Sequence, residues 1–346
     1  MKRGDNANAC ANTEMEGTHM PRVKWNAYRF PWRSLSQSAA GAILLAACVA
    51  GPAAGQQSGQ KTFPSPEEAA RALYAAAQSN DTKALLELLG PDGKEVVSSG
   101  DEAEDNRNRA NFAKRYQEMS RLVKEPDGSV CLYIGERNWP YPIPLVNKGN
   151  QWYFDTNAGK KEILFRRVGW NEISAIHICE QLVAAQKDFA KQNNNEYAEK
   201  IFSDQGKHDG LYWKAGDNEP QSPIGPLIAW AVAQDNANNS GGAPAPYRGY
   251  YFRVLTEQGK NASGGVKSYI VDGRMTGGFA FIAYPAEYRS SGVMTFIVGE
   301  DGVVYEKDLG KKTETVAKSM KEYNPSPGWE KAEEEPQESA AEQTHK

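Results

Sequence analysis

The chain has 346 residues, enough for two domains of ordinary size, and a formal net charge of −4. Its 40% of hydrophobic and 10% of aromatic residues are typical of a folded protein and exclude a wholly disordered chain. Because the body of the chain contains no basic run, the composition argues against nucleic acid as a partner.

The first 55 residues have the pattern of an export signal. Residues 20–33 carry four basic side chains and no acidic one, and the small and apolar run of residues 34–47 follows. This order is that of a secretory signal, and the apolar run is shorter than the ~20 residues that span a bilayer. Residues 1–19 contain three acidic side chains, which a signal lacks, so we expect translation to start at Met20.

Two processing sites fit this signal, and both stay open. The AAG of residues 53–55 fits cleavage before Gln56. The LAAC of residues 45–48 fits a bacterial lipobox, which would leave Cys48 lipidated. In either case we predict an exported protein, periplasmic or in the outer envelope, that touches a membrane only through a lipid on Cys48.

Export would leave two cysteines in the body of the chain, Cys131 and Cys179. An oxidising compartment favours a disulfide between them, which would close a loop of about 48 residues and contribute ~4 kcal/mol. Two separate thiols buried as small apolar side chains are the alternative, because the sequence does not show how closely the two Cα atoms approach.

A first domain, residues 62–168, is predicted to begin with three helices. The SPEE motif that starts at Ser65 fits a capping box with proline in the first helical position, and Asp81 fits the cap of a second helix. An apolar stripe from Phe112 to Val123 indicates the third helix.

Three or four strands are predicted to follow, with the NKGN of residues 147–150 as a hairpin loop. Helices followed by an antiparallel meander is the order of NTF2-like and cystatin-like folds, and PIPLVNKGNQWYFD resembles strands of that group. The resemblance implies a pocket between sheet and helices, which Trp152 and Phe154 would line unless they belong to the core. The predicted strands are residues 130–134, 143–146, 151–155 and 163–167.

A second domain, residues 169–323, is predicted to consist of a long helix and an antiparallel sheet, so the fold class is α+β. The helix would begin at Asn171, and an irregular insertion at 193–246 would contain one more helix at 226–234. The acidic tail from residue 330 to 346 is predicted to be disordered.

The predicted second sheet alternates short β-rich runs with turn signals, among them two Asp-Gly pairs. With the helix packed on one face, Phe281 and Ile297 should point into the core while Glu300 and Asp301 lie at a solvent-facing turn. The predicted strands are residues 250–255, 268–271, 278–283, 293–298 and 303–307.

This order of one long helix and then a sheet, with NEISAI, AAQKDFA, YYFRV and a final TFIV–DGVVY hairpin, resembles the globular head of type IV pilin-like proteins. The chain departs from a pilin directly ahead of the helix, where RRVGW and a soluble domain replace the hydrophobic assembly helix and its processing site. The resemblance therefore implies the architecture of the head and not polymerisation into a pilus.

Several longer stretches of the sequence resemble an exported bacterial family of unknown function, DUF2950. They are DGLYW, SPIGPL, GYYFRVLTEQG, GRMTGGFAFIAYPAEY and GVMTFIVGEDGVVYEKDLG, and the resemblance runs from Phe63 to Trp329. It implies a protein of the bacterial envelope and transfers no catalytic residue.

No motif in the chain specifies a reaction. We find no G-x-S-x-G elbow, no H-E-x-x-H and no phosphate loop, and no histidine with a neighbour at metal-ligand spacing, so we predict neither a cofactor nor a metal. The candidates for catalysis are Glu287, among aromatic residues at a strand end, and Asp272 and Arg274 at a turn. Hydrolysis by a carboxylate pair would require them to share one cleft.

Three functions remain open from the sequence. The first is a non-enzymatic envelope protein that binds or assembles with another envelope protein or a glycan, and the lack of any catalytic motif favours it. The second is an envelope hydrolase, which would need two carboxylates within about 10 Å in a deep cleft. The third is a binder of a small ligand, which a largely apolar cavity of several hundred Å³ in the first domain would favour.

Overall fold

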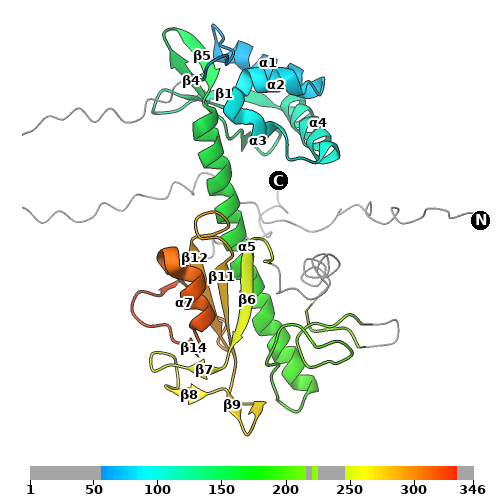
Figure 1. The fold of residues 1–346 in the computed structure, drawn as a ribbon, viewed down its shortest axis with the longest axis vertical. Coiled ribbons are helices and arrows are strands. Elements are labelled where there is room, and N and C mark those ends of the chain that lie inside the picture. The colour runs from blue at the N-terminus through cyan, green and yellow to red at the C-terminus, as the bar shows by residue number, and fades with distance from the viewer. Residues whose placement is uncertain (1–55, 216–219, 225–245, 333–346) are drawn as a thin grey trace, which may run out of the picture. The chain divides into compact units, whose positions relative to one another are not determined.

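The computed structural model describes residues 56–215, 220–224 and 246–332 (Figure 1). Helices and antiparallel strands make the fold α+β, as predicted, and they form two hydrophobic cores. The predicted signal region, residues 1–55, and the helix predicted at 226–234 lie outside the described residues. Within the described ranges, no helix is long and apolar enough to cross a membrane.

Residues 56–155 form the first lobe, and its helices begin at the predicted caps. The Ser65 hydroxyl accepts a hydrogen bond from the Glu68 N–H at 3.2 Å, and Asp81 Oδ1 accepts one from the Ala84 N–H at 2.9 Å. Asp101 caps a further helix in the same way. The helical elements are α1 (Pro66–Gln78), α2 (Thr82–Leu89), η1 (Pro91–Gly93), α3 (Lys94–Val97) and α4 (Glu102–Glu118).

The third predicted helix is shorter than its apolar stripe. α4 ends at Glu118, Met119 has an extended backbone (φ −163°, ψ 135°), and Val123 lies in a strand opposite Cys131. Apolar residues three and four positions apart do not distinguish a continued helix from a helix that runs directly into a strand. The hydrogen bonds to the neighbouring strand decide the outcome.

The first sheet is antiparallel, in the order β1-β2-β4-β5, with β3 paired to β2. The NKGN segment forms the predicted hairpin between β4 and β5, and Gly149 and Asn150 both have positive φ (59° and 68°), as a tight hairpin turn requires. The strands are β1 (Ser120–Lys124), β2 (Val130–Ile134), β3 (Trp139–Pro140), β4 (Leu145–Lys148) and β5 (Gln151–Phe154).

The first hydrophobic core lies between this sheet and the apolar faces of α1 and α2. Leu73, Leu88 and Leu89 pack there with Leu132 and Phe154, and each side chain is no more than 2% exposed. Removing such side chains from water is the main favourable term in folding this lobe.

One helix of 37 residues, α5 (Thr156–Gln192), follows the first sheet (Figure 1). Asp155 caps it by accepting from the Ala158 N–H at 3.0 Å, so the helix begins well before the predicted Asn171. The strand predicted at 163–167 is therefore wrong. The side chains of Glu162 and Arg166, 2.7 Å apart and one helical turn apart in sequence, support the helix where an apolar run indicated a strand.

The second sheet is also antiparallel, in the order β15-β13-β12-β11-β6. Four of its strands lie where the sequence predicts them, to within two residues at each end, and β15 was not predicted. The strands are β6 (Tyr250–Leu255), β11 (Ala280–Pro285), β12 (Met294–Gly299), β13 (Val304–Asp308) and β15 (Glu330–Lys331).

Both faces of this sheet are covered, which differs from the single covered face that we predicted. Phe281 and Ile297 are both fully buried, but on opposite faces, because Ile297 pairs with the residue that follows Phe281. α7 (Thr313–Ser319) covers the face of Ile297, where Arg253 donates to the carbonyls of Ala317 and Met320. α5 contacts the other face (Figure 1).

The Asp-Gly turns form as predicted. Asp272 and Gly273 both have positive φ and join β9 (Ile270–Val271) to β10 (Arg274–Met275). Glu300 and Asp301 are exposed at the turn between β12 and β13.

The strand predicted at 268–271 is divided between β8 (Lys267–Ser268) and β9. The Ser268 hydroxyl accepts from the Ile270 N–H at 3.1 Å, a local bond that competes with a continuous ladder. β8 lies in a small sheet with β7 (Glu257–Gln258) and β14 (Glu322–Tyr323).

The insertion is irregular in its described part, as predicted. Residues 193–215 and 220–224 contain only isolated bridges, and Leu211 and Ile224 anchor the segment in the second core. The disorder predicted from residue 330 is wrong for its first three residues, because β15 pairs with β13 and Ala332 is buried. The free edge of β13 forms backbone hydrogen bonds with β15, although both residues of β15 are charged.

A candidate ligand pocket in the first lobe

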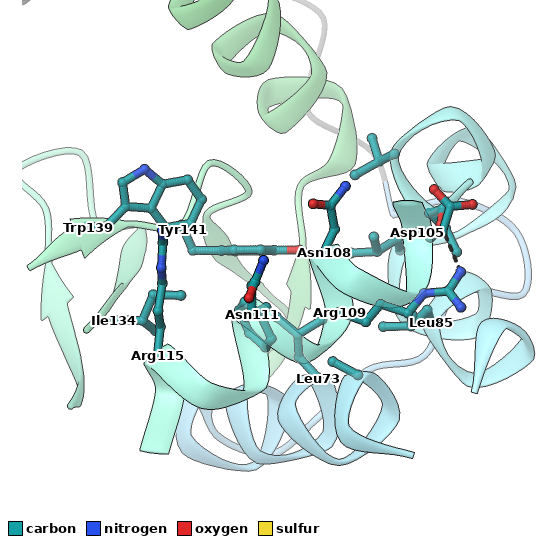
Figure 2. Close-up of a pocket in the computed structure, with 15 residues that line it drawn as sticks. Leu73, Leu85, Asp105, Asn108, Arg109, Asn111, Arg115, Ile134, Trp139 and Tyr141 are labelled. Carbon is teal, nitrogen blue, oxygen red and sulfur yellow. Dashed lines mark hydrogen bonds between the residues drawn. The ribbon is translucent and has the colours of Figure 1, made fainter. Parts of the chain in front are cut away.

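A cavity of about 350 Å³ lies in the first lobe, between the helices and strands β2 and β3 (Figure 2). Its apolar wall comes from four elements, with Leu73 on α1, Leu85 and Leu89 on α2, Val97 on α3 and Ile134 on β2. The wall is thus an uncovered part of the first hydrophobic core.

α4 leaves the cavity open because its facing side is polar. Asp105, Asn108, Arg109, Phe112 and Arg115 recur three and four residues apart, so they lie along one side of the helix, and all five line the cavity. Only one of them is apolar, so α4 does not fill the space as a Leu-rich helix would.

At one end of the cavity, the charged groups are hydrogen-bonded to other groups of the protein. Asp105 is buried and accepts from the Ser99 N–H at 2.9 Å and the Ser98 hydroxyl at 3.0 Å, and the bond from Ser99 lowers the pKa of this carboxyl. Arg109 donates to the Val97 carbonyl at 3.0 Å and to Asn80. These bonds hold α3 against α4, so we assign this end a structural role.

Tyr141 forms an aromatic part of the wall. Its ring packs against those of Phe112, Phe154 and Trp139, with centroids 5.4, 6.3 and 6.4 Å away. In the described part of the chain its hydroxyl makes no hydrogen bond, and burial raises the pKa of this phenol far above its ordinary value. In Figure 2 the ring extends into the space beside Asn108 and Asn111.

Trp139 connects the cavity wall to the beginning of α5. The Arg166 guanidinium lies 5.4 Å from the Trp139 ring centroid and donates to the Pro140 carbonyl at 2.7 Å. A cation held over an aromatic face is attracted by the negative face of the ring. The rim of the cavity is therefore held in place by a helix outside the first core.

The aromatic residues named from the sequence are not the ones that line the cavity. Trp152 and Phe154 pack in the first core, which is the alternative that the sequence left open. Phe112, Trp139 and Tyr141 line the cavity instead. Alternation in a strand does not show which of two aromatic neighbours faces a helix and which faces a gap.

The three candidates for catalysis do not share a cleft. Asp272 and Arg274 lie at the β9–β10 turn, where Arg274 approaches Glu196 to 3.8 Å. Glu287 follows the other end of β11, where the next turn is closed by Ser291. The six residues of β11 span about 20 Å. The structure thus separates the residues that a carboxylate mechanism would need together.

Cys131 and Cys179 are both free thiols, so the predicted disulfide is not formed. Cys131 lies on β2 with its sulfur 3.7 Å from the Tyr141 carbonyl oxygen, whereas Cys179 is fully buried in the second core. Burial raises the pKa of both thiols, that of Cys131 to about 11. Different neighbours surround the two sulfurs, which is the other alternative that the sequence allowed.

Glu172 is a half-buried acidic group that sequence reasoning missed. Its carboxylate accepts from the N–H groups of Val293 and Met294 at 2.7 and 3.0 Å, and Asn171 beside it donates to the Ser291 carbonyl at 2.8 Å. Burial raises the pKa of Glu172. Its bonds hold the start of β12 against α5, so its role is structural, and nothing in the local pattern distinguishes it from other helix acids.

The fold and the cavity define an α+β protein with a partly polar pocket in its first lobe. Residues 60–332 match the family described as protein of unknown function (DUF2950), and the chain belongs to this family. Neither a curated protein nor a solved structure matches the chain. In the described residues, no three His, Cys, Asp or Glu side chains gather in a way that would hold a metal ion.

Proposed function

We propose that this protein is an exported, non-enzymatic protein of the bacterial envelope whose first lobe binds a small amphipathic ligand. The observation that carries the proposal is the cavity of about 350 Å³, within the range of ordinary ligand sites. An apolar wall with a few polar groups on one side is the usual composition of such sites. The basic and then apolar N-terminal segment supports export.

The second lobe, which consists of α5 and the elements of the second core, supports a role in presenting this pocket at the envelope. Its long helix and antiparallel sheet have the element order of a type IV pilin-like head, which favours contact with another envelope protein or a glycan. The wide separation of Glu287 from Asp272 and Arg274 favours binding over hydrolysis.

The size of the cavity bounds the ligand. At ~30 Å³ for a water-sized group, the cavity holds on the order of ten non-hydrogen atoms. Ligands of this size have dissociation constants of roughly 1 μM to 1 mM in favourable pockets. The binding assay must therefore tolerate weak complexes.

Native mass spectrometry of the protein purified from its bacterial host tests the proposal. We expect a small molecule of defined mass that is released on denaturation. Ala77→Phe should fill the cavity and abolish this complex, whereas Ala75→Phe, exposed on the same helix, should retain it. Asn108→Trp should block the cavity from an exposed position without enlarging a core side chain.

The proposal fails if the host protein carries no ligand and takes up none from a library of small amphipathic compounds. It also fails if the Ala77→Phe and Asn108→Trp variants, folded by their melting temperature, bind as well as the unchanged protein.

A further inference from the structure

We infer that the ligand is an acyl compound, with a carbonyl-type oxygen that accepts a hydrogen bond from the Tyr141 hydroxyl and an apolar chain that lies against the leucine-rich wall. The inference rests on the proposed function, and it adds the chemical class of the ligand and the residue that recognises it. Two kinds of ligand have a carbonyl oxygen on an alkyl chain, namely a fatty acid and an acyl amide.

The first argument is the position of the Tyr141 hydroxyl. Three aromatic rings hold the side chain, so the hydroxyl cannot move far toward water. It makes no hydrogen bond in the described residues, although it borders the cavity. The hydroxyl thus lies at the surface of a largely apolar cavity without a protein partner, and a ligand oxygen placed there would accept a hydrogen bond in surroundings of low polarity.

The direction of that bond follows from the chemistry of the phenol. Burial keeps Tyr141 protonated throughout the physiological pH range, so it offers an O–H donor. The ligand atom that it recognises is therefore an acceptor. The amides of Asn108 and Asn111, which line the cavity beside it, supply both donors and acceptors to the same end of a ligand.

The charges at the cavity exclude a cationic head. Asp105 is already bonded by Ser98 and Ser99, and Arg109 by Val97 and Asn80. Arg115 adds an exposed positive charge to the rim. A neutral amide or a carboxylate is compatible with this arrangement, whereas a quaternary ammonium group meets a guanidinium and finds no free carboxylate.

The rest of the cavity accepts the chain. Leu73, Leu85, Leu89 and Val97 give it an apolar wall without a charged group. An alkyl chain of about eight carbons with a two-atom head matches room for on the order of ten non-hydrogen atoms. Longer chains would have to leave the cavity at the exposed side of α4.

Four compounds of roughly 9 to 12 non-hydrogen atoms, close to the capacity of the cavity, test the inference, with binding followed by ligand-observed NMR on the mature protein. They are propylbenzene, octanamide, octanoate and octyltrimethylammonium. We expect the first three to bind and the cationic compound to bind at least tenfold more weakly than octanamide.

Tyr141→Phe removes the proposed donor and keeps the ring. It should weaken octanamide and octanoate by about 3- to 10-fold, the range of one hydrogen bond, and leave propylbenzene unchanged. Tyr133→Phe, on the neighbouring strand and outside the cavity wall, is the matched control and should change none of them. Arg115→Gln distinguishes the two sources, because it should weaken octanoate and not octanamide.

The outcomes separate the two proposals. If propylbenzene and both acyl compounds all fail to bind, the proposed function itself is wrong. If propylbenzene binds and Tyr141→Phe leaves the acyl compounds unaffected, or if octyltrimethylammonium binds as tightly as octanamide, the pocket exists and the acyl inference is overturned.

Discussion

Phe281 illustrates how much one side chain contributes to the second core. It is fully buried and packs at a ring-centroid distance of 6.0 Å from Phe279, on the face of the sheet that α5 contacts. Phe281→Ala would leave a cavity and should lower the free energy of unfolding by ~3–5 kcal/mol. Urea denaturation measures this change.

Phe165→Ala is the matched control, because Phe165 is 45% exposed on α5 and the same atoms are removed. We expect a loss below ~1 kcal/mol there. Equal losses at the two positions would contradict the assignment of Phe281 to the core.

Glu172 makes stability depend on pH in an unusual direction for a carboxylate. Burial raises its folded-state pKa above the unfolded value, so the folded state binds the proton more tightly. This contribution to stability is fully present below the unfolded pKa near 4.5 and is lost as pH rises through the folded pKa. Glu172→Gln should therefore gain stability relative to the wild type as pH rises from 4 to 7.

Urea titrations at the two pH values measure this difference, and Glu300→Gln serves as the control at an exposed turn. A Glu172→Gln variant whose stability difference from wild type is the same at both pH values would contradict a raised pKa of Glu172 in the folded state.

At the scale of the element, α5 contains two glycines in different surroundings. A Cβ on Gly169 would meet nothing within 4 Å, whereas a Cβ on Gly159 would collide with the Ile143 side chain. Alanine has the higher helix propensity, so Gly169→Ala should stabilise the protein by ~0.5–1 kcal/mol. Gly159→Ala should destabilise it, because a collision in the packed first lobe outweighs the gain in propensity.

Thermal unfolding of the two variants gives the comparison directly. Stabilisation by both substitutions would show that α5 does not pack on Ile143. Destabilisation by both would show that residue 169 does not lie at a helical position with free space around it.

The same helix shows why some elements were predicted and others were not. Ser65 and Asp81 cap α1 and α2 by hydrogen bonds to the residue three positions later in the chain. A few adjacent residues are therefore enough to predict these caps. The segment 163–167 begins with three apolar residues that favour a strand, and its helical state is supported by the Asp155 cap and by the Glu162–Arg166 pair. Short apolar runs are ambiguous between helix and strand until such neighbours are considered.

At the scale of the whole molecule, we predict that the N-terminal segment is removed during export. The signal pattern before Cys48 motivates this expectation. Mass spectrometry of the protein from its native host should find an N-terminus at Gln56, or a lipid-modified Cys48. Mature protein that begins at Met1 or Met20 would disprove export by this signal.

Sequence alone determined the family, the α+β class and most strands of the second sheet. The stretches shared with the family, the helix caps and the Asp-Gly turns all depend on residues that are neighbours in the sequence. Tertiary structure alone decided the pocket, because its wall joins α1, α2, α3, α4 and two strands, and the polar side of α4 becomes visible only against them. It also decided that Phe281 and Ile297 are buried on opposite faces, since strand alternation does not show how many faces a sheet has covered. The two free thiols and the separated carboxylates follow from the same cause, for distances between residues far apart in sequence arise only when the elements pack.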